Sequence, residues 1–429
     1  MSQRQPPKVI ILGAGISGLT LAQLLRKQDI PFEVYEKDES INYRGVGYAI
    51  GLYDLESTFA DNILPDDLPL FSTACHLLPL SLPSQLMTYF PDGKVFGVTD
   101  CNETRCLRAS RAKLREEVLS RNIKINWGKR VINIYEEEDD GGSEVMTVEF
   151  QDGSKTGGDI IVGADGTFSR VREIVLRKGN KEVLRRVPMG VIVGQVRLGI
   201  EDTERQLGLG HSVVFSIGED EGKNHFNLFV GLNKIELDDK GVVEGGSFYW
   251  ILTEYDEGVC EDEEHWGRRE GMEEKLKRAK EMVERGLKRK ELRLVVERTG
   301  VEGVKSGGWD VWWDAEIEGV PSGRGNVVLI GDAAHPMTPI RGEGAIYAMR
   351  DAVALSKVIA KSDIGDMEEM KAGLDKVQKE IIEKGLESIR AGRAIIADGL
   401  AGAADQKMMA WGHELRMVDR VEPLPIKLM

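Results

Sequence analysis

The sequence predicts an α/β protein that combines a parallel sheet, an inserted antiparallel sheet and a long C-terminal helix. Three observations lead to this prediction. An apolar run at residues 9–12 turns through a glycine loop into a helix-like segment. Residues 123–162 and 186–255 show the period-two alternation of β-strands. Residues 367–389 repeat apolar side chains at spacings of four and three, which is typical of an amphipathic helix.

The composition is that of a soluble globular protein. Of 429 residues, 41% are hydrophobic and 30% are charged, and the formal net charge is -15. Phosphate repels an acidic chain, which argues against nucleic acid or an anionic membrane surface as a partner. A Lys- and Arg-rich stretch at 275–290 also carries Glu at helical spacing, so we interpret it as a solvated helix face.

Cysteine usage and hydropathy favour a cytoplasmic location. The cysteines form no CxxC pair and have no histidine at metal-ligand spacing, so neither a disulfide framework nor a metal site is expected. The first apolar run stops at Gly13, and no uninterrupted run approaches the ~18 residues of a membrane span. We expect a monomer or a homodimer without membrane contacts. The four cysteines are Cys75, Cys101, Cys106 and Cys260.

A strand, a tight turn and a helix open the chain. The apolar run is followed by Gly13, Gly15 and Gly18, which have the spacing G-x-G-x-x-G. In this motif the first glycine makes the turn, the second lets the backbone approach a pyrophosphate, and the third lets the helix pack on the strand. Free N–H groups and the helix dipole attract phosphate. The context predicts a dinucleotide-binding site.

Glu36 ends the next predicted strand, PFEVYEK. Its distance from the glycine loop is close to the ~20 residues expected of an acid that accepts hydrogen bonds from a ribose. A carboxylate at this position favours a free 2′-hydroxyl over a 2′-phosphate. FAD or NAD is therefore expected rather than NADP.

Two arginines follow at positions suited to a ligand. Arg44 lies in the glycine-rich sequence INYRGVGYAIGL, which is either a loop close to a flat ligand or an ordinary surface turn. Arg111 lies in the first turn of a predicted helix that Ser110 caps. Because an arginine opposes the helix dipole there, we expect it to bind a ligand anion.

Polar residues interrupt the predicted strands at two places. An apolar strand leads into Gly163-Ala164-Asp165-Gly166, where Asp165 is either a ligand-binding acid or a simple turn residue. Gln195 and Arg197 share one face of another strand, because side-chain direction alternates along it. That polar pair either faces water or lines a pocket.

The segment LIGDAAHPMTPIRGEGA, residues 329–345, runs from a strand end into two prolines and three glycines. Asp332 stands at its head, and the prolines stiffen the loop. The glycine-started helix that follows offers N–H groups and a positive dipole end. Only one G-x-G-x-x-G fingerprint is present, so no separate nicotinamide-binding domain is expected.

Together the three motifs resemble those of the class A, single-component FAD-dependent aromatic hydroxylases. They are GAGISG at 13–18, GADGTFSRVR at 163–172 and GDAAHPMTPIRGEGA at 331–345, and the R-G-E-G form is similar to fungal relatives of secondary metabolism. The resemblance implies a discontinuous Rossmann-like FAD-binding domain of the glutathione-reductase type, an inserted antiparallel β-sheet substrate domain and a C-terminal helix. The implied boundaries are 1–70, 101–178 and 296–362 for the FAD-binding domain, 71–100 and 179–295 for the substrate-binding domain, and 363–429 for a C-terminal helical region.

The resemblance implies cofactor roles for residues of all three motifs. The backbone of Gly342, Gly344 and Ala345 would bind the pyrimidine edge of the flavin, where the reduced ring is anionic. Glu343, where many members carry Gln, would repel that anion unless its carboxylate points away or is protonated, so its role stays open. The other implied positions are Gly13, Gly15, Gly18 and Glu36 at the ADP half of FAD, Arg111 at the pyrophosphate and ribityl chain, Asp165 at FAD and NAD(P)H, Asp332 at the ribityl chain or ribose, and Arg44, Val46 and Gly47 beside the isoalloxazine.

The implied activity is that of an FAD-dependent monooxygenase that uses NAD(P)H and O2. A flavin C4a-hydroperoxide would transfer one oxygen atom to an aromatic or indole-like small molecule in natural-product biosynthesis. The substrate pocket is expected between the strands of 186–255 and the flavin ring. Arg197 is the first candidate for a catalytic cation in that pocket, and Arg44 is the second.

Other activities on related scaffolds fit the sequence less well. A flavin-dependent halogenase needs W-x-W-x-I-P, and the sequence contains only FYWILTEY and WDVWWD. A plain NAD dehydrogenase does not need the second and third motifs, and a nucleotide-binding protein without activity would be colourless. The alternative that stays open is a flavin oxidase or reductase that inserts no oxygen. The sequence does not decide the substrate, NADH versus NADPH, or hydroxylation versus epoxidation versus Baeyer–Villiger insertion.

Overall fold

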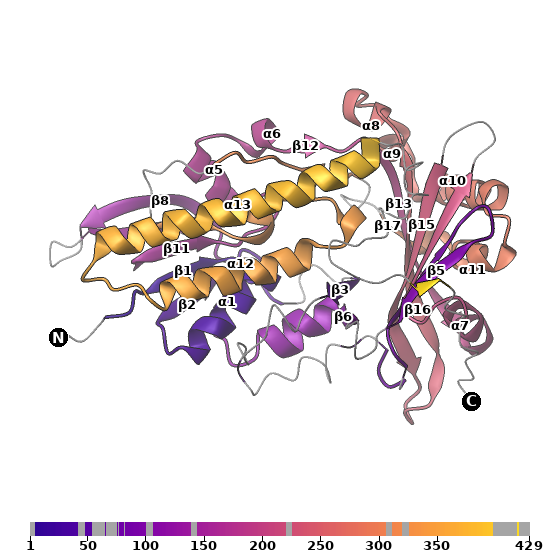
Figure 1. Ribbon diagram of the computed structural model, residues 1–429, viewed down its shortest axis with the longest axis horizontal. Coiled ribbons are helices and arrows are strands. Elements are labelled where there is room, and N and C mark those ends of the chain that lie inside the picture. The colour runs from indigo at the N-terminus through magenta and orange to yellow at the C-terminus, as the bar shows by residue number, and fades with distance from the viewer. Residues whose placement is uncertain are drawn as a thin grey trace.

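In the computed structural model the chain forms two main sheets, and one long helix reaches from one to the other (Figure 1). The N-terminal parallel sheet carries the glycine loop, and the second sheet is built mainly from the middle of the chain. The structure describes residues 5–41, 48–53, 65, 75, 77–80, 82–99, 106–138, 144–219, 225–305, 311–319, 326–397 and 418–419.

The five-stranded sheet is parallel throughout, with the strand order β19-β11-β1-β2-β7. The sequence VIIL of β1 carries no polar residue because this central strand is buried along its whole length. The carboxyl ends of parallel strands open at one edge of the sheet, so the loops that follow β1, β2, β11 and β19 meet there. The strands are β1 (Val9–Leu12), β2 (Phe32–Tyr35), β7 (Ile125–Asn126), β11 (Ile160–Gly163) and β19 (Val327–Leu329).

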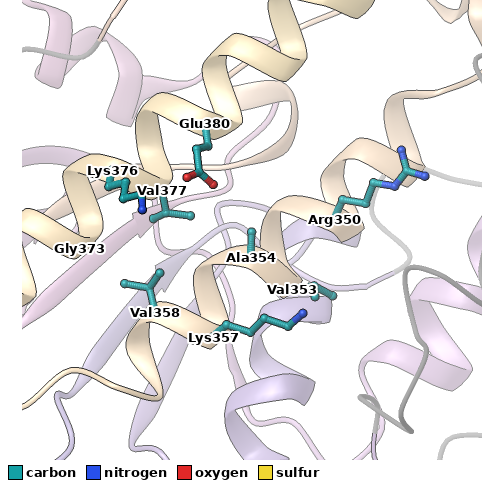
Figure 2. A pocket seen from close by; sticks show the side chains of 9 residues that line it. All are labelled: Arg350, Val353, Ala354, Lys357, Val358, Gly373, Lys376, Val377 and Glu380. Carbon is teal, nitrogen blue, oxygen red and sulfur yellow. The ribbon is translucent and has the colours of Figure 1, made fainter.

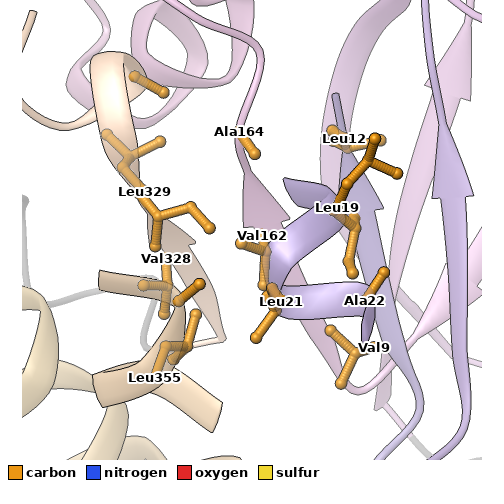
Figure 3. Packing of buried hydrophobic residues seen from close by; sticks show 14 of the residues in the cluster. Val9, Leu12, Leu19, Leu21, Ala22, Val162, Ala164, Val328, Leu329 and Leu355 are labelled. Carbon is orange, nitrogen blue, oxygen red and sulfur yellow. The ribbon is translucent and has the colours of Figure 1, made fainter. Parts of the chain in front are cut away.

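Two helices cover one face of this sheet. α1 (Ile16–Lys27) packs between the sheet and α12 (Gly344–Ile359), which explains why it is apolar nearly all round. Figure 3 shows Leu19 and Leu21 of α1 in one cluster with Val162 of β11. α13 (Met367–Ala397) lies over α12 and extends toward the second sheet (Figure 1).

A three-stranded antiparallel meander covers the opposite face, as the period-two pattern predicts. Its Phe150 stacks on Tyr35 of β2 with the ring centroids 4.7 Å apart, and Val148 is buried in the same cluster as Ile10. The strands are β8 (Val131–Glu138), β9 (Glu144–Phe150) and β10 (Lys155–Gly158).

The second sheet has eight strands in the order β17-β13-β16-β15-β14-β4-β5-β20. Every pairing is antiparallel except that of β14 with β4. The strands are β4 (Gln85–Tyr89), β5 (Val95–Thr99), β13 (Met189–Gly199), β14 (Val213–Glu219), β15 (His225–Leu237), β16 (Val243–Tyr255), β17 (Val304–Lys305) and β20 (Val418–Asp419).

The two faces of the eight-stranded sheet have different neighbours. The helices α7 (Ile200–Leu207), α10 (Met272–Gly286) and α11 (Leu294–Arg298) cover one face, where Trp250 is fully buried. Because side chains alternate along each strand, Tyr249 points to the other face, which meets the two-stranded antiparallel sheet of β3 (Ala49–Tyr53) and β6 (Cys106–Ser110).

Two short strands pair across the expected domain boundaries. β17 lies within the range 296–362, which we assigned to the FAD-binding domain, but it pairs with β13 of the eight-stranded sheet. β20 lies within the range 363–429, which we assigned to a helical region, but it pairs with β5. In both cases the segment is only two residues long, and strand periodicity cannot be recognised over so short a length.

The remaining elements are short. None of the helices within the described ranges is long and apolar enough to cross a lipid bilayer. These elements are β12 (Arg185–Arg186), β18 (Trp313–Asp314), α4 (Arg111–Lys113), η2 (Leu114–Leu119), α5 (Arg170–Leu176), α6 (Asn180–Val183), α8 (Gly258–Glu261), α9 (Trp266–Arg269), η3 (Lys290–Arg293), η4 (Val301–Gly303), η5 (Gly331–Ala333) and η6 (Pro339–Arg341).

Candidate functional site

The glycine loop after β1 packs too tightly for larger residues. Gly13 has a φ of +120°, and a Cβ atom there would lie 2.2 Å from the carbonyl oxygen of Ala164. A Cβ atom on Gly18 would lie 2.0 Å from the carbonyl oxygen of Gly13. Gly15 is the N-cap of α1 and offers no side-chain cap, so the first N–H groups of the helix are open to a ligand. This geometry suits a phosphate at the helix N-terminus.

Glu36 lies at the end of β2, and its carboxylate reaches back to the glycine loop. One carboxylate oxygen accepts a hydrogen bond from the backbone N–H of Ala14 at 2.9 Å, and the other accepts from that of Asp38 at 3.1 Å. Each carboxylate oxygen can accept further bonds, for example from ribose hydroxyls. Arg115 also binds this loop, because its Nε donates a hydrogen bond to the backbone carbonyl of Ala14 at 2.8 Å. Sequence reasoning did not single out Arg115.

A cleft of about 120 Å³ connects these residues with those of the second motif. Arg111 lies on its wall at the start of α4, where the hydroxyl of Ser110 accepts a hydrogen bond from the N–H of Lys113 at 3.4 Å, so the expected N-cap is present. The structure therefore brings four of the candidate residues to a single cleft. It is lined by Gly15, Glu36, Lys37, Asp38, Arg111, Ala112, Arg115, Glu116, Ala164, Asp165 and Gly166.

Asp165 both borders the cleft and closes the turn before α5. Its carboxylate accepts hydrogen bonds from the hydroxyl of Ser169 at 2.5 Å and from the backbone N–H groups of Arg170 at 2.7 Å and Val171 at 3.2 Å. Burial raises the pKa of Asp165, and these hydrogen bonds act in the opposite direction. In the structure Asp165 thus makes the contacts of a turn residue.

Arg172 ties the second motif to the third. Its buried guanidinium donates to the backbone carbonyls of Asp332 at 3.2 Å and Ala333 at 3.1 Å, and to that of Thr167 at 2.5 Å. The Asp332 carboxylate in turn accepts from the hydroxyl of Thr167 at 3.1 Å. Arg172 was not predicted as a site residue, although an arginine among the apolar positions of the helix after GADG was a signal for a buried role.

The third motif is anchored to α12 by a buried ion pair. Nε2 of His335 lies 2.6 Å from the Asp351 carboxylate, which also accepts the backbone N–H of Gly331 at 2.8 Å. Burial acts to lower the pKa of His335, but the Asp351 carboxylate beside it raises that pKa above its ordinary value. These contacts hold Asp332 at the sheet edge, facing the second motif.

The turn between the third motif and α12 presents backbone to the site. Gly342 has a φ of +62°, a conformation that favours glycine. The helix starts at Gly344, and its N-cap residue Glu343 makes no side-chain cap, so the first N–H groups of α12 are open to a ligand. The Glu343 carboxylate turns instead toward Arg341 and α13. The Glu343 carboxylate therefore points away from those N–H groups, which is one of the two arrangements that would avoid repulsion of a flavin anion there.

Aromatic side chains line the second sheet where it meets the two-stranded β3–β6 sheet. The centroid of the Phe229 ring lies 5.4 Å from that of Tyr249 and 5.0 Å from that of Phe215. The ring of Tyr48 lies 6.0 Å from that of Tyr249. Burial raises the pKa of Tyr48, and the charge of Arg111 acts to lower it, so this residue joins the aromatic face to the cofactor residues.

One buried cation stands within this aromatic face. Arg108 of β6 is 3% exposed, and its guanidinium donates to the hydroxyl of Tyr249 at 2.6 Å and to the carbonyl of Ala49 at 2.8 Å. The Tyr249 hydroxyl itself donates to the carbonyl of Ala49 at 2.8 Å. Burial raises the pKa of Tyr249, and the Arg108 charge opposes this shift.

Comparisons with known proteins identify the family. A family model described as an FAD binding domain matches residues 235–376, and one described as an NAD(P)-binding Rossmann-like domain matches residues 11–44. The FAD-dependent monooxygenase thnD of Trichoderma harzianum is 38% identical over 391 residues, which cover 90% of this chain and 92% of that relative. The chain belongs to the FAD-dependent monooxygenases. This monooxygenase is an FAD-binding oxidoreductase with NAD(P)H as its co-substrate.

Solved structures share the fold of the monooxygenase. A putative FAD-containing monooxygenase from Photorhabdus luminescens aligns with a TM-score of 0.69 at 21% identity, covering 92% of this chain and 98% of that one. HpxO of Klebsiella pneumoniae, whose structure contains FAD and uric acid, aligns with a TM-score of 0.67 at 22% identity, covering 95% and 92%.

The two arginines that we expected to be catalytic have different outcomes. Arg197 lies near the end of β13 on the same face as Tyr249, but its side chain is 62% exposed and pairs with Glu244 at 2.6 Å. Arg108 is a buried cation on the same face of the monooxygenase, and the role of Arg197 in the pocket stays a prediction. Arg44, Val46 and Gly47 lie outside the described residues.

A larger hollow, of about 430 Å³, lies between α12 and α13. Figure 2 shows Lys357 of α12 and Glu380 of α13 lining it from opposite sides. Of the expected cofactor-binding residues that the structure describes, none lines this hollow. We assign it no role in the monooxygenase reaction.

Proposed function

We propose that this monooxygenase inserts one oxygen atom into an aromatic small molecule that lies against the aromatic face of the eight-stranded sheet. The observation that carries the proposal is the buried Arg108–Tyr249 pair among Phe229, Phe215 and Tyr48. An electron-rich ring with a phenolic or carbonyl oxygen would stack on the aromatic side chains and turn its oxygen to Arg108. Uric acid in the HpxO structure is likewise a flat heteroaromatic ligand.

FAD would extend along the carboxyl edge of the parallel sheet. The pyrophosphate would lie at Gly13, Gly15 and Gly18, where open helix N–H groups and the lack of side chains fit it. Further contacts would come from Glu36 at the adenosine ribose, Arg111 at the pyrophosphate, Asp165 beside the cleft, Asp332 at the ribityl chain, and the backbone of Gly342, Gly344 and Ala345 at the pyrimidine edge. When bound, FAD would accept electrons from NAD(P)H and activate O2.

The chain's own residues would orient the substrate and keep water out. In a buried site the charge of Arg108 acts through a low dielectric, so it stabilises a negative substrate oxygen far more than an exposed arginine would. The Tyr249 hydroxyl donates to Ala49 and accepts from Arg108, which holds the guanidinium in one orientation. Phe215 and Phe229 exclude water from the ring position.

The first test is Arg108→Gln. We expect the variant to keep its yellow FAD and to lose about two orders of magnitude in substrate-dependent NAD(P)H oxidation, because a buried charge that meets the substrate is removed. Mass spectrometry with 18O2 on a panel of phenolic and indole compounds measures oxygen insertion directly. Phe90→Leu, at a part-buried ring away from the pocket, is the control for general damage to the second sheet.

Two results would contradict the proposal. Hydrogen peroxide without 18O in any product across the panel would indicate a flavin oxidase or reductase instead. Unchanged turnover in Arg108→Gln would remove the Arg108–Tyr249 pair from the substrate site.

We also infer a role in natural-product biosynthesis and a cytoplasmic location. The R-G-E-G form of the third motif supports the first inference. The second is supported by a cysteine pattern without CxxC pairs, in which Cys75 and Cys260 are free thiols.

A further inference from the structure

Glu343 is a buried carboxylate with three side-chain donors. Arg341 donates to it twice, from Nε at 2.8 Å and from Nη2 at 2.9 Å. The hydroxyl of Ser388, on α13, donates to Oε2 at 2.6 Å. Both Glu343 and Ser388 are 4% exposed. A bidentate pair with a third donor is the arrangement that compensates a carboxylate for the loss of water.

α13 comes close enough to make this contact because it carries small residues on one side. A Cβ atom on Gly385 would lie 2.4 Å from Cβ of His335, so the approach requires a glycine there, whereas one on Gly392 would make an ordinary contact of 3.4 Å with Cγ2 of Ile340. Ser388 lies between these two glycines on the helix. The helix therefore rests directly on the loop from His335 to Arg341, with one hydroxyl aimed at Glu343.

The far end of α13 is fixed independently. Arg393 forms a two-point ion pair with Asp314, with distances of 2.8 and 2.5 Å, and Arg390 pairs with Glu316 at 3.0 Å. Ile396 packs against residues of β13. The helix is thus attached at both sheets, and it can hold the turn at Glu343 in a set position.

The charges at this turn cancel. Glu343 carries one negative charge and Arg341 carries one positive charge, and both residues come directly before the N-terminus of α12 in the chain. An unpaired carboxylate there would oppose negative charge on a ligand at those N–H groups, and an unpaired guanidinium would favour it. Because the ion pair is neutral, the field of the helix N-terminus is the main electrostatic influence on a ligand at those N–H groups.

We propose that Glu343, Arg341 and Ser388 form a charge-neutral positioning cluster that sets the reduction potential of the bound FAD. The inference rests on the proposed function, because it requires the flavin pyrimidine edge to lie at residues 342–345. Glu343 and Ser388 act as positioning residues. Ser388 directs the carboxylate toward α13, and the carboxylate neutralises Arg341.

The decisive experiment measures the midpoint potential of the FAD by spectroelectrochemistry in the holoenzyme. Glu343→Gln should shift the potential to a more positive value, because the Arg341 charge is then no longer balanced beside the reduced, anionic flavin. The double variant Arg341→Gln with Glu343→Gln removes both charges and should return the potential close to that of the wild type. A role confined to folding would give no such return.

Ser388→Ala tests the positioning half of the inference. Loss of a hydrogen bond to a charged group should raise the Kd for FAD about three- to tenfold. Lys379→Gln is the matched control, since it removes an exposed ion pair with Glu383 from the same helix and should leave the Kd unchanged.

The outcomes separate this inference from the proposed function. An unchanged potential in Glu343→Gln, or a double variant that shifts as far as the single one, overturns the cluster. Gly342→Ala places a side chain at a φ of +62° and should weaken FAD binding several-fold. If Gly342→Ala leaves both FAD affinity and potential unchanged, the proposed flavin placement fails instead.

Discussion

At the scale of single residues, burial decides what each arginine of the second sheet can do. Arg197 and Arg108 both lie at the face that meets the parallel-sheet part. Water screens the pair of Arg197 with Glu244, and such exposed pairs contribute little to stability. Arg108 is buried beside aromatic rings, with its guanidinium 5.9 Å from the centroid of Phe229. Solvent therefore screens its charge much less than that of Arg197.

Arg197→Ala should therefore behave almost as the wild type. We expect a change in the free energy of unfolding of at most ~0.5 kcal/mol and an unchanged turnover, because the removed ion pair is solvent-exposed. Urea denaturation and NAD(P)H consumption measure the two quantities. A loss of turnover comparable to that of Arg108→Gln would support Arg197 as a catalytic cation instead.

At the scale of elements, α13 packs on the third motif, and a glycine of the helix sets how closely the two approach. Gly385 lies against the ring of His335, and that histidine is itself bound to Asp351 of α12. One buried histidine, His335 of the third motif, thus links α13 to α12. Displacing the helix at this point would move the residues that start α12.

Two glycines of α13 give a matched pair of variants. Gly385→Ala should destabilise the protein by about 1–2 kcal/mol, because overpacking against His335 outweighs the gain in helix propensity. Gly392→Ala meets only ordinary contacts and should be neutral or stabilising by up to about 1 kcal/mol. Thermal unfolding of both variants checks the prediction, which equal destabilisation would contradict.

At the scale of the whole molecule, the candidate cofactor site gathers segments that are far apart in the chain. The glycine loop, the second motif and the third motif follow three neighbouring strands of the parallel sheet, and Arg172 joins the last two directly. A ligand that touches all of them binds only the folded chain. Its binding energy therefore adds to the stability of the whole fold.

Removal of FAD should lower the stability of the entire protein. At a free FAD concentration 100 times the Kd, the holoenzyme should be more stable than the apoprotein by about 2.7 kcal/mol. Asp332→Ala should lose FAD and with it this difference. Calorimetry with and without added FAD measures the effect, and full flavin occupancy in Asp332→Ala would contradict the placement of Asp332.

Much of the fold was predictable because its signals are local. The G-x-G-x-x-G spacing, the apolar run of β1 and the alternation of the meander each lie within a few residues of chain. The pairing of β20 with β5 has no such signal, since the two strands are more than 300 residues apart. The same holds for Arg108 and Tyr249, which read in the sequence as ordinary strand residues.

The sequence by itself determined the family of motifs, the cofactor class and the edge of the parallel sheet where the cofactor is expected, because glycine spacing and strand order are written in short stretches of chain. Only the tertiary structure decided which arginine is buried and where the Glu343 carboxylate points. Those outcomes depend on partners such as Tyr249 and Ser388, which lie 141 and 45 residues away from the side chains they bind. Burial and pairing are properties of the packed chain, and no local pattern encodes them.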